Sequence, residues 1–207
     1  MLTVLGKASS INVRKVLWTC HELGVAFQRE EWGSGFQSTD IASFRALNPN
    51  AMVPVIRDGD VVLWESNTIC RYLANAHGGA ALYPTGAPDR ARVDQWMDWQ
   101  ATELNNAWRY AFMALVRGSQ QHQDAYAIAA SAASWNRHME IVDGQLQRTG
   151  AFVASERFSL ADIVLGLSAN RWRMTPMKRP ALPALEAWLA RLEQHEGYRL
   201  YGNNGIA

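Results

Sequence analysis

The pattern that decides the fold lies in residues 53–73, which read VPVIRDGDVVLWESNTICRYL. Two apolar runs, Val53–Arg57 and Val61–Trp64, flank an Asp-Gly pair, and this arrangement is among the strongest short-range signals for a β-hairpin. From Ser66 to Ala76 the apolar residues recur at helical spacing. The stretch therefore predicts two antiparallel strands followed by a helix.

The residues before this hairpin alternate between strand and helix patterns. Leu2–Leu5 is a short apolar run, and Ile11–Leu23 carries apolar residues at the spacing of an amphipathic helix. Ala26–Trp32 is a second strand pattern and Thr39–Leu47 a short helix that ends before an Asn-Pro pair. The predicted order is βαβαββα, an α/β domain with a small mixed sheet and covering helices.

The rest of the chain predicts a second, all-helical domain. We expect a first domain over residues 1–79, a linker over 80–88 that is rich in Pro and Gly, and helices from 89 to 207. Ser159 followed by Asp162 is close to a capping box, which marks the start of a helix. The predicted helices are 89–117, 121–148, 160–172 and 182–194.

The composition narrows the function classes. Of the 207 residues, 48% are hydrophobic and 19% charged, and 20 basic against 19 acidic residues leave a net charge of +1. This balance argues against nucleic acid or an anionic membrane surface as the main partner. No apolar stretch approaches the length of a membrane span. Two cysteines, Cys20 and Cys70, make no disulfide framework, so a cytoplasmic location is expected.

Four motifs carry a resemblance to a known family. They are Ser10–Val16, Asn48–Val55, Leu63–Leu73 and Ser159–Ile163, and they occur in that order along nearly the whole chain. With these motifs the chain resembles the cytosolic glutathione S-transferases, most of all the bacterial, serine-type, theta- or zeta-like members. The resemblance implies a thioredoxin-like N-terminal domain that binds glutathione and an all-helical C-terminal domain that forms the pocket for the electrophile.

The chemistry of that family needs a glutathione thiolate, because the thiolate and not the thiol is the nucleophile. Ser10 precedes the first predicted helix, where its hydroxyl can donate a hydrogen bond to sulfur and the helix dipole favours negative charge. A plain helix cap is the competing interpretation of Ser10. Ser9 and Asn12 are alternative donors to the sulfur.

Three further elements are candidates for binding glutathione. Glu65 can pair with the γ-glutamyl ammonium, while Ser66, at a helix start, suits the adjacent carboxylate; a simple capping pair is the alternative. For Val53–Pro54 the resemblance implies a cis bond that presents the backbone of Val53 to the tripeptide, as an added strand would be held. Gln37 is a candidate for the glycyl carboxylate, from its position alone.

The remaining conspicuous residues have less specific interpretations. Trp108 and Phe112, four residues apart, can face the electrophile pocket or pack in the core. Cys20 and Cys70 are expected in the core, Arg57–Asp58 is expected to be solvated charge, and the scattered histidines indicate no metal site.

Three function classes follow from this pattern. The first is a glutathione transferase that conjugates the glutathione thiolate to small electrophilic, mostly apolar substrates. The second is a glutathione-dependent disulfide or peroxide reductase on the same fold, and the third a binding module without catalysis. The resemblance also implies a homodimer, with the helices 89–117 and 121–148 at its interface. The natural electrophile is not predicted by the sequence.

Overall fold

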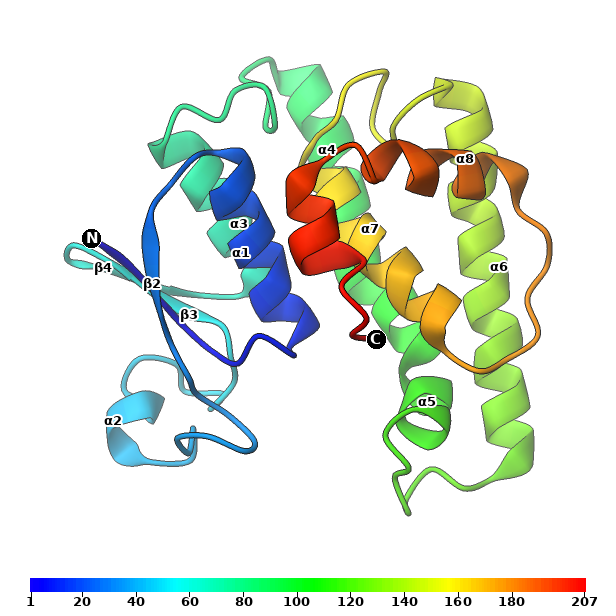
Figure 1. The fold of residues 1–207 in the computed structure, drawn as a ribbon, viewed down its shortest axis with the longest axis horizontal. Helices are drawn as coiled ribbons and strands as arrows, with labels where there is room; N and C mark the ends of the chain where they lie inside the picture. Colours follow the sequence, from blue (N-terminus) through cyan, green and yellow to red (C-terminus); the bar gives the residue numbers. More distant parts are fainter.

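The hairpin forms as the Asp-Gly pair predicts in the computed structural model, which describes all residues 1–207 (Figure 1). Strands β3 (Val55–Asp58) and β4 (Val61–Trp64) pair antiparallel. Strand β1 (Leu2–Leu5) lies between β3, to which it is antiparallel, and β2 (Phe27–Glu30), to which it is parallel. The strand order β2-β1-β3-β4 makes the predicted small mixed sheet.

Side-chain alternation along the strands decides which helix covers which face of the sheet. Val4 and Ile56 point to one face, where they join the core formed by α1 (Ile11–Glu22) and α3 (Ser66–Ala76). Their neighbours Leu5 and Val55 point to the other face and pack against Phe44 of α2 (Ala42–Arg45). Figure 1 shows α1 and α3 together on one side and α2 apart from them. The predicted βαβαββα order is confirmed.

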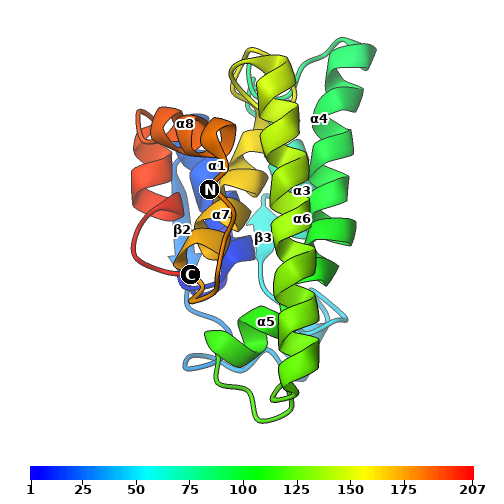
Figure 2. The same ribbon diagram turned by 90° about the vertical axis from the view of Figure 1, so that its right-hand side faces the viewer.

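The second half of the chain contains no strand. Its helices are α4 (Ala87–Trp99), α5 (Asn105–Leu115), α6 (Ala125–Thr149), α7 (Leu160–Met174) and α8 (Pro183–Leu192), with π-helical segments η1 (Gln100–Leu104) and η2 (Tyr198–Gly202). Figure 2 shows the long α6 running the length of this domain, with α5 beside its lower end. None of these helices combines the length and the apolar character that crossing a lipid bilayer requires.

Several predicted helix and strand boundaries are wrong. The helix predicted over residues 89–117 is interrupted by η1 and ends at Leu115. A π-helical segment of a single turn is too short to be recognised from the spacing of apolar residues. The next helix starts at Ala125 rather than 121, since Asp124 caps it by accepting from the Ala127 N–H at 2.7 Å. The second strand and the short helix after it are both shorter than predicted.

The two domains meet along α1. This helix packs against α7 and η2, and the fully buried indole of Trp18 lies 5.4 Å from the ring of Tyr198 in η2. A buried lysine also crosses the interface: the Lys15 Nζ donates to Gln100 at 2.7 Å and to Asn67 at 3.1 Å. The start of α1 is thereby held in place against the helical domain.

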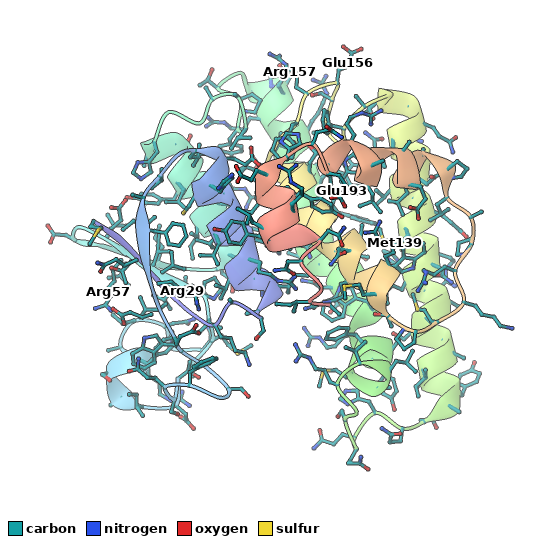
Figure 3. All side chains as sticks on the ribbon, viewed as in Figure 1. Arg29, Arg57, Met139, Glu156, Arg157 and Glu193 are labelled. Carbon is teal, nitrogen blue, oxygen red and sulfur yellow. The ribbon has the colours of Figure 1, made fainter.

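The pair Arg57–Asp58 is not the solvated charge that the sequence indicates. Arg57 donates to Glu30 of β2 at 2.8 Å. Asp58 accepts from the Tyr72 hydroxyl at 3.0 Å, which ties the hairpin to α3. Figure 3 shows Arg57 and Arg29 near the sheet, and the strand register places them on opposite faces of it. Both side chains of the pair are therefore partnered, Arg57 by a residue of β2 and Asp58 by a residue of α3, because the fold brings these positions together.

Candidate active site

Ser10 lies at the start of α1, where the sheet-containing domain faces the helical domain. Its backbone is extended (φ −77°, ψ 124°), and its N–H donates to the Lys7 carbonyl at 3.1 Å. The Ser10 side chain makes no capping hydrogen bond to α1, although serine often caps helices in this way. Its hydroxyl is therefore left for another partner, at the positive end of the helix dipole.

A cavity of about 490 Å³ opens beside Ser10, and both domains contribute to its walls. The sheet-containing domain contributes Lys7, Ser10 and Ile11. The helical domain contributes Trp108, Arg109, Phe112, Met113, Arg117, His122 and Arg171. Figure 1 shows that the first turn of α1 and helix α5 lie toward the same, lower side of the molecule. The cavity thus joins a free hydroxyl to an aromatic wall.

The three sequence-predicted donors to sulfur differ in their relation to this cavity. Ser10 is among its lining residues, whereas Ser9 and Asn12 are not. All three side chains are partly exposed, and none makes a hydrogen bond within the protein. Position relative to the cavity, and not accessibility, therefore separates Ser10 from its neighbours.

The predicted aromatic pair lines the cavity. Trp108 and Phe112 lie one turn apart on α5, with ring centroids 5.4 Å apart and ring planes at 81°. The Trp108 Nε1 donates to the Asn105 side chain at 3.1 Å, which holds the indole in place. Phe112 is buried and Trp108 partly exposed, so the pair serves both the core and the cavity wall.

Sequence reasoning missed the positive charge of this cavity. Arg171, in the last turn of α7, reads as an ordinary cation at a helix C-terminus, yet its guanidinium lies over the Phe112 ring at 4.1 Å. Burial, and then the proximity of Arg14 and Arg117, lower the pKa of Arg171 to about 9. No local signal indicates this cluster, because its members come from α1, α5, α7 and the loop after α5.

Glu65 and Ser66 lie where β4 turns into α3. Glu65 has a positive φ of 71°, which is rare for a residue with a side chain, and its carboxylate is exposed and makes no ion pair or hydrogen bond in the protein. Ser66 begins α3, so its N–H is one of the first-turn groups that have no partner within the helix. An exposed carboxylate thus lies next to free N–H donors.

The bond between Val53 and Pro54 is cis, as the resemblance implies. Neither the N–H nor the C=O of Val53 makes a hydrogen bond within the protein. Val53 also packs close to the end of β1: a Cβ on Gly6 would lie 3.1 Å from the Val53 Cβ and 2.4 Å from Val13, so only glycine fits there. The free backbone of Val53 is therefore adjacent to the loop that leads to Ser10.

Gln37 is outside the cavity. Its side chain is exposed and donates to the Glu31 carbonyl at 3.3 Å, and its backbone forms an isolated bridge with Trp32. The same loop is linked to the cavity by Lys7, whose Nζ donates to the Ser34 carbonyl at 3.1 Å. Gln37 thus occupies the loop after β2, as expected, but at a distance from the aromatic wall.

Cysteine chemistry is not available at this site. Cys20 and Cys70 are fully buried and are not among the residues that line the cavity. Burial raises the pKa of Cys20 to about 12 and that of Cys70 to about 11. Neither thiol can therefore supply a thiolate near neutral pH. The structure holds no group of three or more His, Cys, Asp or Glu side chains arranged as metal ligands.

A second, larger cavity of about 620 Å³ lies elsewhere, between the 80–93 segment and the loop before α7. Its lining includes Glu156 and Arg157, which Figure 3 shows at the upper edge of the molecule, together with Asp89 and Arg92. It contains no aromatic pair, and the hydroxyl at its helix start, that of Ser159, already donates to Asp162. The chemistry points to the smaller cavity.

Comparisons with known proteins agree along the whole chain. The family model "Glutathione S-transferase, N-terminal domain" matches residues 9–76, and "Glutathione S-transferase, C-terminal domain" matches residues 125–191. The chain is 34% identical over 201 residues to glutathione S-transferase GstB of Escherichia coli K12, with 96% of each chain covered. It is 30% identical over 191 residues to mouse glutathione S-transferase theta-3, covering 86% of this chain and 76% of the mouse protein.

Solved structures extend this similarity to the three-dimensional fold. The theta class glutathione S-transferase from the citrus canker pathogen Xanthomonas axonopodis pv. citri, with glutathione bound, superposes with a TM-score of 0.92. The two chains are 38% identical, and the match covers 100% of this chain and 99% of that one. The apo form of the same enzyme gives a TM-score of 0.84.

Proposed function

This chain belongs to the glutathione S-transferase family, and we propose that within it the hydroxyl of Ser10 activates the thiol of bound glutathione. As a member of this family the chain is a glutathione transferase, which joins the sulfur of glutathione to an electrophile. The observation that carries the proposal is the Ser10 hydroxyl, which leaves α1 uncapped and lines the cavity.

The catalytic step needs only an ionised sulfur held next to the electrophile. The Ser10 hydroxyl donates to the thiolate, and the N-terminus of α1 adds a favourable dipole. A hydrogen bond to a charged group stabilises it by about 1.5–3 kcal/mol, and one pKa unit corresponds to about 1.4 kcal/mol. The arrangement therefore lowers the thiol pKa by about one to two units. No general base is required.

Glutathione itself is held by the sheet-containing domain, residues 1–79. Glu65 pairs with the γ-glutamyl ammonium, and the Ser66 hydroxyl with the first N–H groups of α3 binds the adjacent carboxylate. The free N–H and C=O of Val53, beside Pro54, support a backbone pairing with the tripeptide like that of an added strand. Gln37, in the loop after β2, is the candidate for the glycyl carboxylate.

The electrophile binds in the cavity beyond Ser10. Trp108 and Phe112 form its apolar wall. They belong to the helical domain, which we expect over residues 89–207, after a linker over 80–88. The thiolate attacks the electrophilic carbon and the leaving group departs with its electron pair. Proximity of the two reactants in one cavity supplies much of the acceleration.

The replacement Ser10→Ala tests the assignment directly. We expect the pKa of the thiol in the enzyme–glutathione complex, followed by the ultraviolet absorbance of the thiolate, to rise by about one to two units. The turnover of 1-chloro-2,4-dinitrobenzene near neutral pH should fall about 10- to 100-fold, while the affinity for glutathione changes little. Ser9→Ala is the matched control and should behave like the wild type. An unchanged thiol pKa in Ser10→Ala would move the role to Ser9 or Asn12.

A parallel test separates binding from activation. Glu65→Ala should weaken glutathione binding in calorimetry while the pKa of the bound thiol stays constant, since Glu65 lies outside the cavity lining.

Assays with a mixed disulfide and a hydroperoxide compare transferase with reductase turnover. Binding of glutathione without turnover of any of these substrates would instead identify a binding module.

We extend the proposal to the assembly and its location. A homodimer with helices 89–117 and 121–148 at its interface is expected, as in the resemblance above, and equilibrium sedimentation tests it. A cytoplasmic location is consistent with two buried, unpaired cysteines. Glutathione and a small electrophile are the only ligands that the proposal requires.

A further inference from the structure

Positive charge surrounds the cavity beyond Ser10. Lys7, Arg109, Arg117 and Arg171 line it, and no Asp or Glu is among the lining residues. None of these four cations takes part in an ion pair with another residue of the chain. The cavity therefore holds a surplus of uncompensated positive charge.

Arg171 is the least expected of these cations. Only 4% of its surface is exposed, and its guanidinium makes no hydrogen bond within the protein. Its contacts are instead with aromatic faces, the Phe112 ring at 4.1 Å and the Trp108 ring at 4.7 Å. A buried charge is unfavourable unless it is paired and hydrogen-bonded. This guanidinium thus lacks the counter-charge that buried arginines normally have.

Glutathione does not supply that counter-charge. In the proposed function its two carboxylates lie against Ser66 and the loop of Gln37, neither of which lines the cavity. The thiolate at Ser10 brings a single negative charge, against four cations. Of the four cations only Arg171 is buried, and the other substrate is the remaining ligand that can bring a counter-charge to it.

We propose that the electrophile of this enzyme is a flat, apolar molecule that carries a carboxylate, and that Arg171 binds this carboxylate. The planar fork of a guanidinium matches a carboxylate in two parallel hydrogen bonds. Ile11, Met113 and the aromatic pair surround the apolar body, while Arg109 and Arg117 add charge at the exposed rim. The inference rests on the proposed function, because the same cavity receives the thiolate held by Ser10.

For an aryl halide the step is balanced without a further reactant. The thiolate sulfur attacks the ring carbon that bears the halogen, the C–S bond forms and the C–halogen bond breaks. The halide leaves with the electron pair, and the carboxylate is unchanged. Arg171 acts only in binding and orienting the ring.

Two probes that differ in charge alone test the inference: 4-chloro-3,5-dinitrobenzoate and its neutral amide, 4-chloro-3,5-dinitrobenzamide. Each kcat/KM is divided by the rate of the uncatalysed reaction with glutathione, which removes the difference in intrinsic reactivity. We expect the wild type to favour the benzoate by about tenfold or more. Arg171→Met should lower the benzoate value by about 10- to 100-fold, the size of one charge-assisted contact, and the amide value by less than about threefold.

The matched control is Arg173→Met, on the same helix but outside the cavity, which should leave both values unchanged. If Arg171→Met fails to fold by circular dichroism, Arg117→Met at the exposed rim replaces it, with an expected loss of about threefold for the benzoate alone. Equal rates for both probes in the wild type, or equal losses in the variant, would overturn the inference.

A binding measurement separates this inference from the proposed function. 3,5-Dinitrobenzoate has no leaving group, and calorimetry follows its binding to enzyme saturated with S-methylglutathione. Binding to the wild type that is lost in Arg171→Met supports the anion site, and no binding to the wild type overturns it. Ser10→Ala should slow both chloro probes equally and leave 3,5-dinitrobenzoate binding intact, so a failure at Ser10 is recognised independently.

Discussion

Replacing Asp162 by alanine should strongly destabilise the protein. The Asp162 carboxylate is fully buried in the first turn of α7 and accepts four hydrogen bonds. Its donors are the Val153 N–H, the Ser159 N–H and hydroxyl, each at 2.9 Å, and the Trp188 Nε1 at 3.0 Å. Alanine leaves these donors without an acceptor in a site that water does not reach.

The magnitude follows from two opposing effects. Each of the three buried N–H donors left unpaired costs about 1–3 kcal/mol, or roughly 6 kcal/mol together. Against this, burial raises the pKa of Asp162 from 3.8 to about 6, so the charge itself costs about 3 kcal/mol that alanine removes. The net loss is about 3 kcal/mol, which lowers the Tm of a chain of this length by roughly 6–12 °C.

Urea unfolding followed by tryptophan fluorescence measures this loss. Asp124→Ala is the matched control, because Asp124 also caps a helix but is exposed and accepts one bond, from the Ala127 N–H at 2.7 Å. The control should lose about 1 kcal/mol. If Asp162→Ala and Asp124→Ala lower the free energy of unfolding by the same amount, burial does not determine how much a capping carboxylate stabilises its helix, and the reasoning is refuted.

Two further predictions concern the interface along α1. Burial lowers the pKa of Lys15 from 10.5 to about 8, so between these pH values the unfolded chain binds more protons than the folded one. The stability of the wild type relative to Lys15→Met should therefore rise with pH from about 8 to 10.5. Urea unfolding at a series of pH values measures it. A Cβ on Gly197 would lie 2.2 Å from the Trp18 ring, so Gly197→Ala should lose about 1–3 kcal/mol. Gly144→Ala, in open space on α6, should instead gain up to about 1 kcal/mol in the same urea unfolding. A neutral Gly197→Ala would contradict the prediction, because the Trp18 ring would then have moved without cost.

The main strands and helices could be predicted from the sequence because the signals for them are local. The Asp-Gly pair between apolar runs predicts the β3–β4 hairpin, and Ser159 with Asp162 predicts the start of α7. Both signals lie within a few residues, at the scale on which turns and caps form. The end of α4 could not be predicted, because the spacing of apolar residues does not reveal the change to the π-helical η1.

The candidate site also combines features that local sequence predicts with features that only the fold reveals. Ser10 was accessible because a helix start is visible in the sequence, and Trp108 with Phe112 because they are one turn apart. That Ser10, and not Ser9 or Asn12, lines the cavity could not be predicted from three polar residues near one helix start, and the structure supplies this difference.

The sequence alone determined the βαβαββα order of the first domain, the helical character of the rest and the family, because these depend on periodicity, turns and motifs within short windows. Only the tertiary structure decided that Arg171 of α7 lies over the rings of α5 and beside the start of α1, in a cavity without a carboxylate. The physical reason is that burial and charge balance are set by every element that packs around a group. At this cavity those elements include α1 and α7, which lie more than a hundred residues apart along the chain.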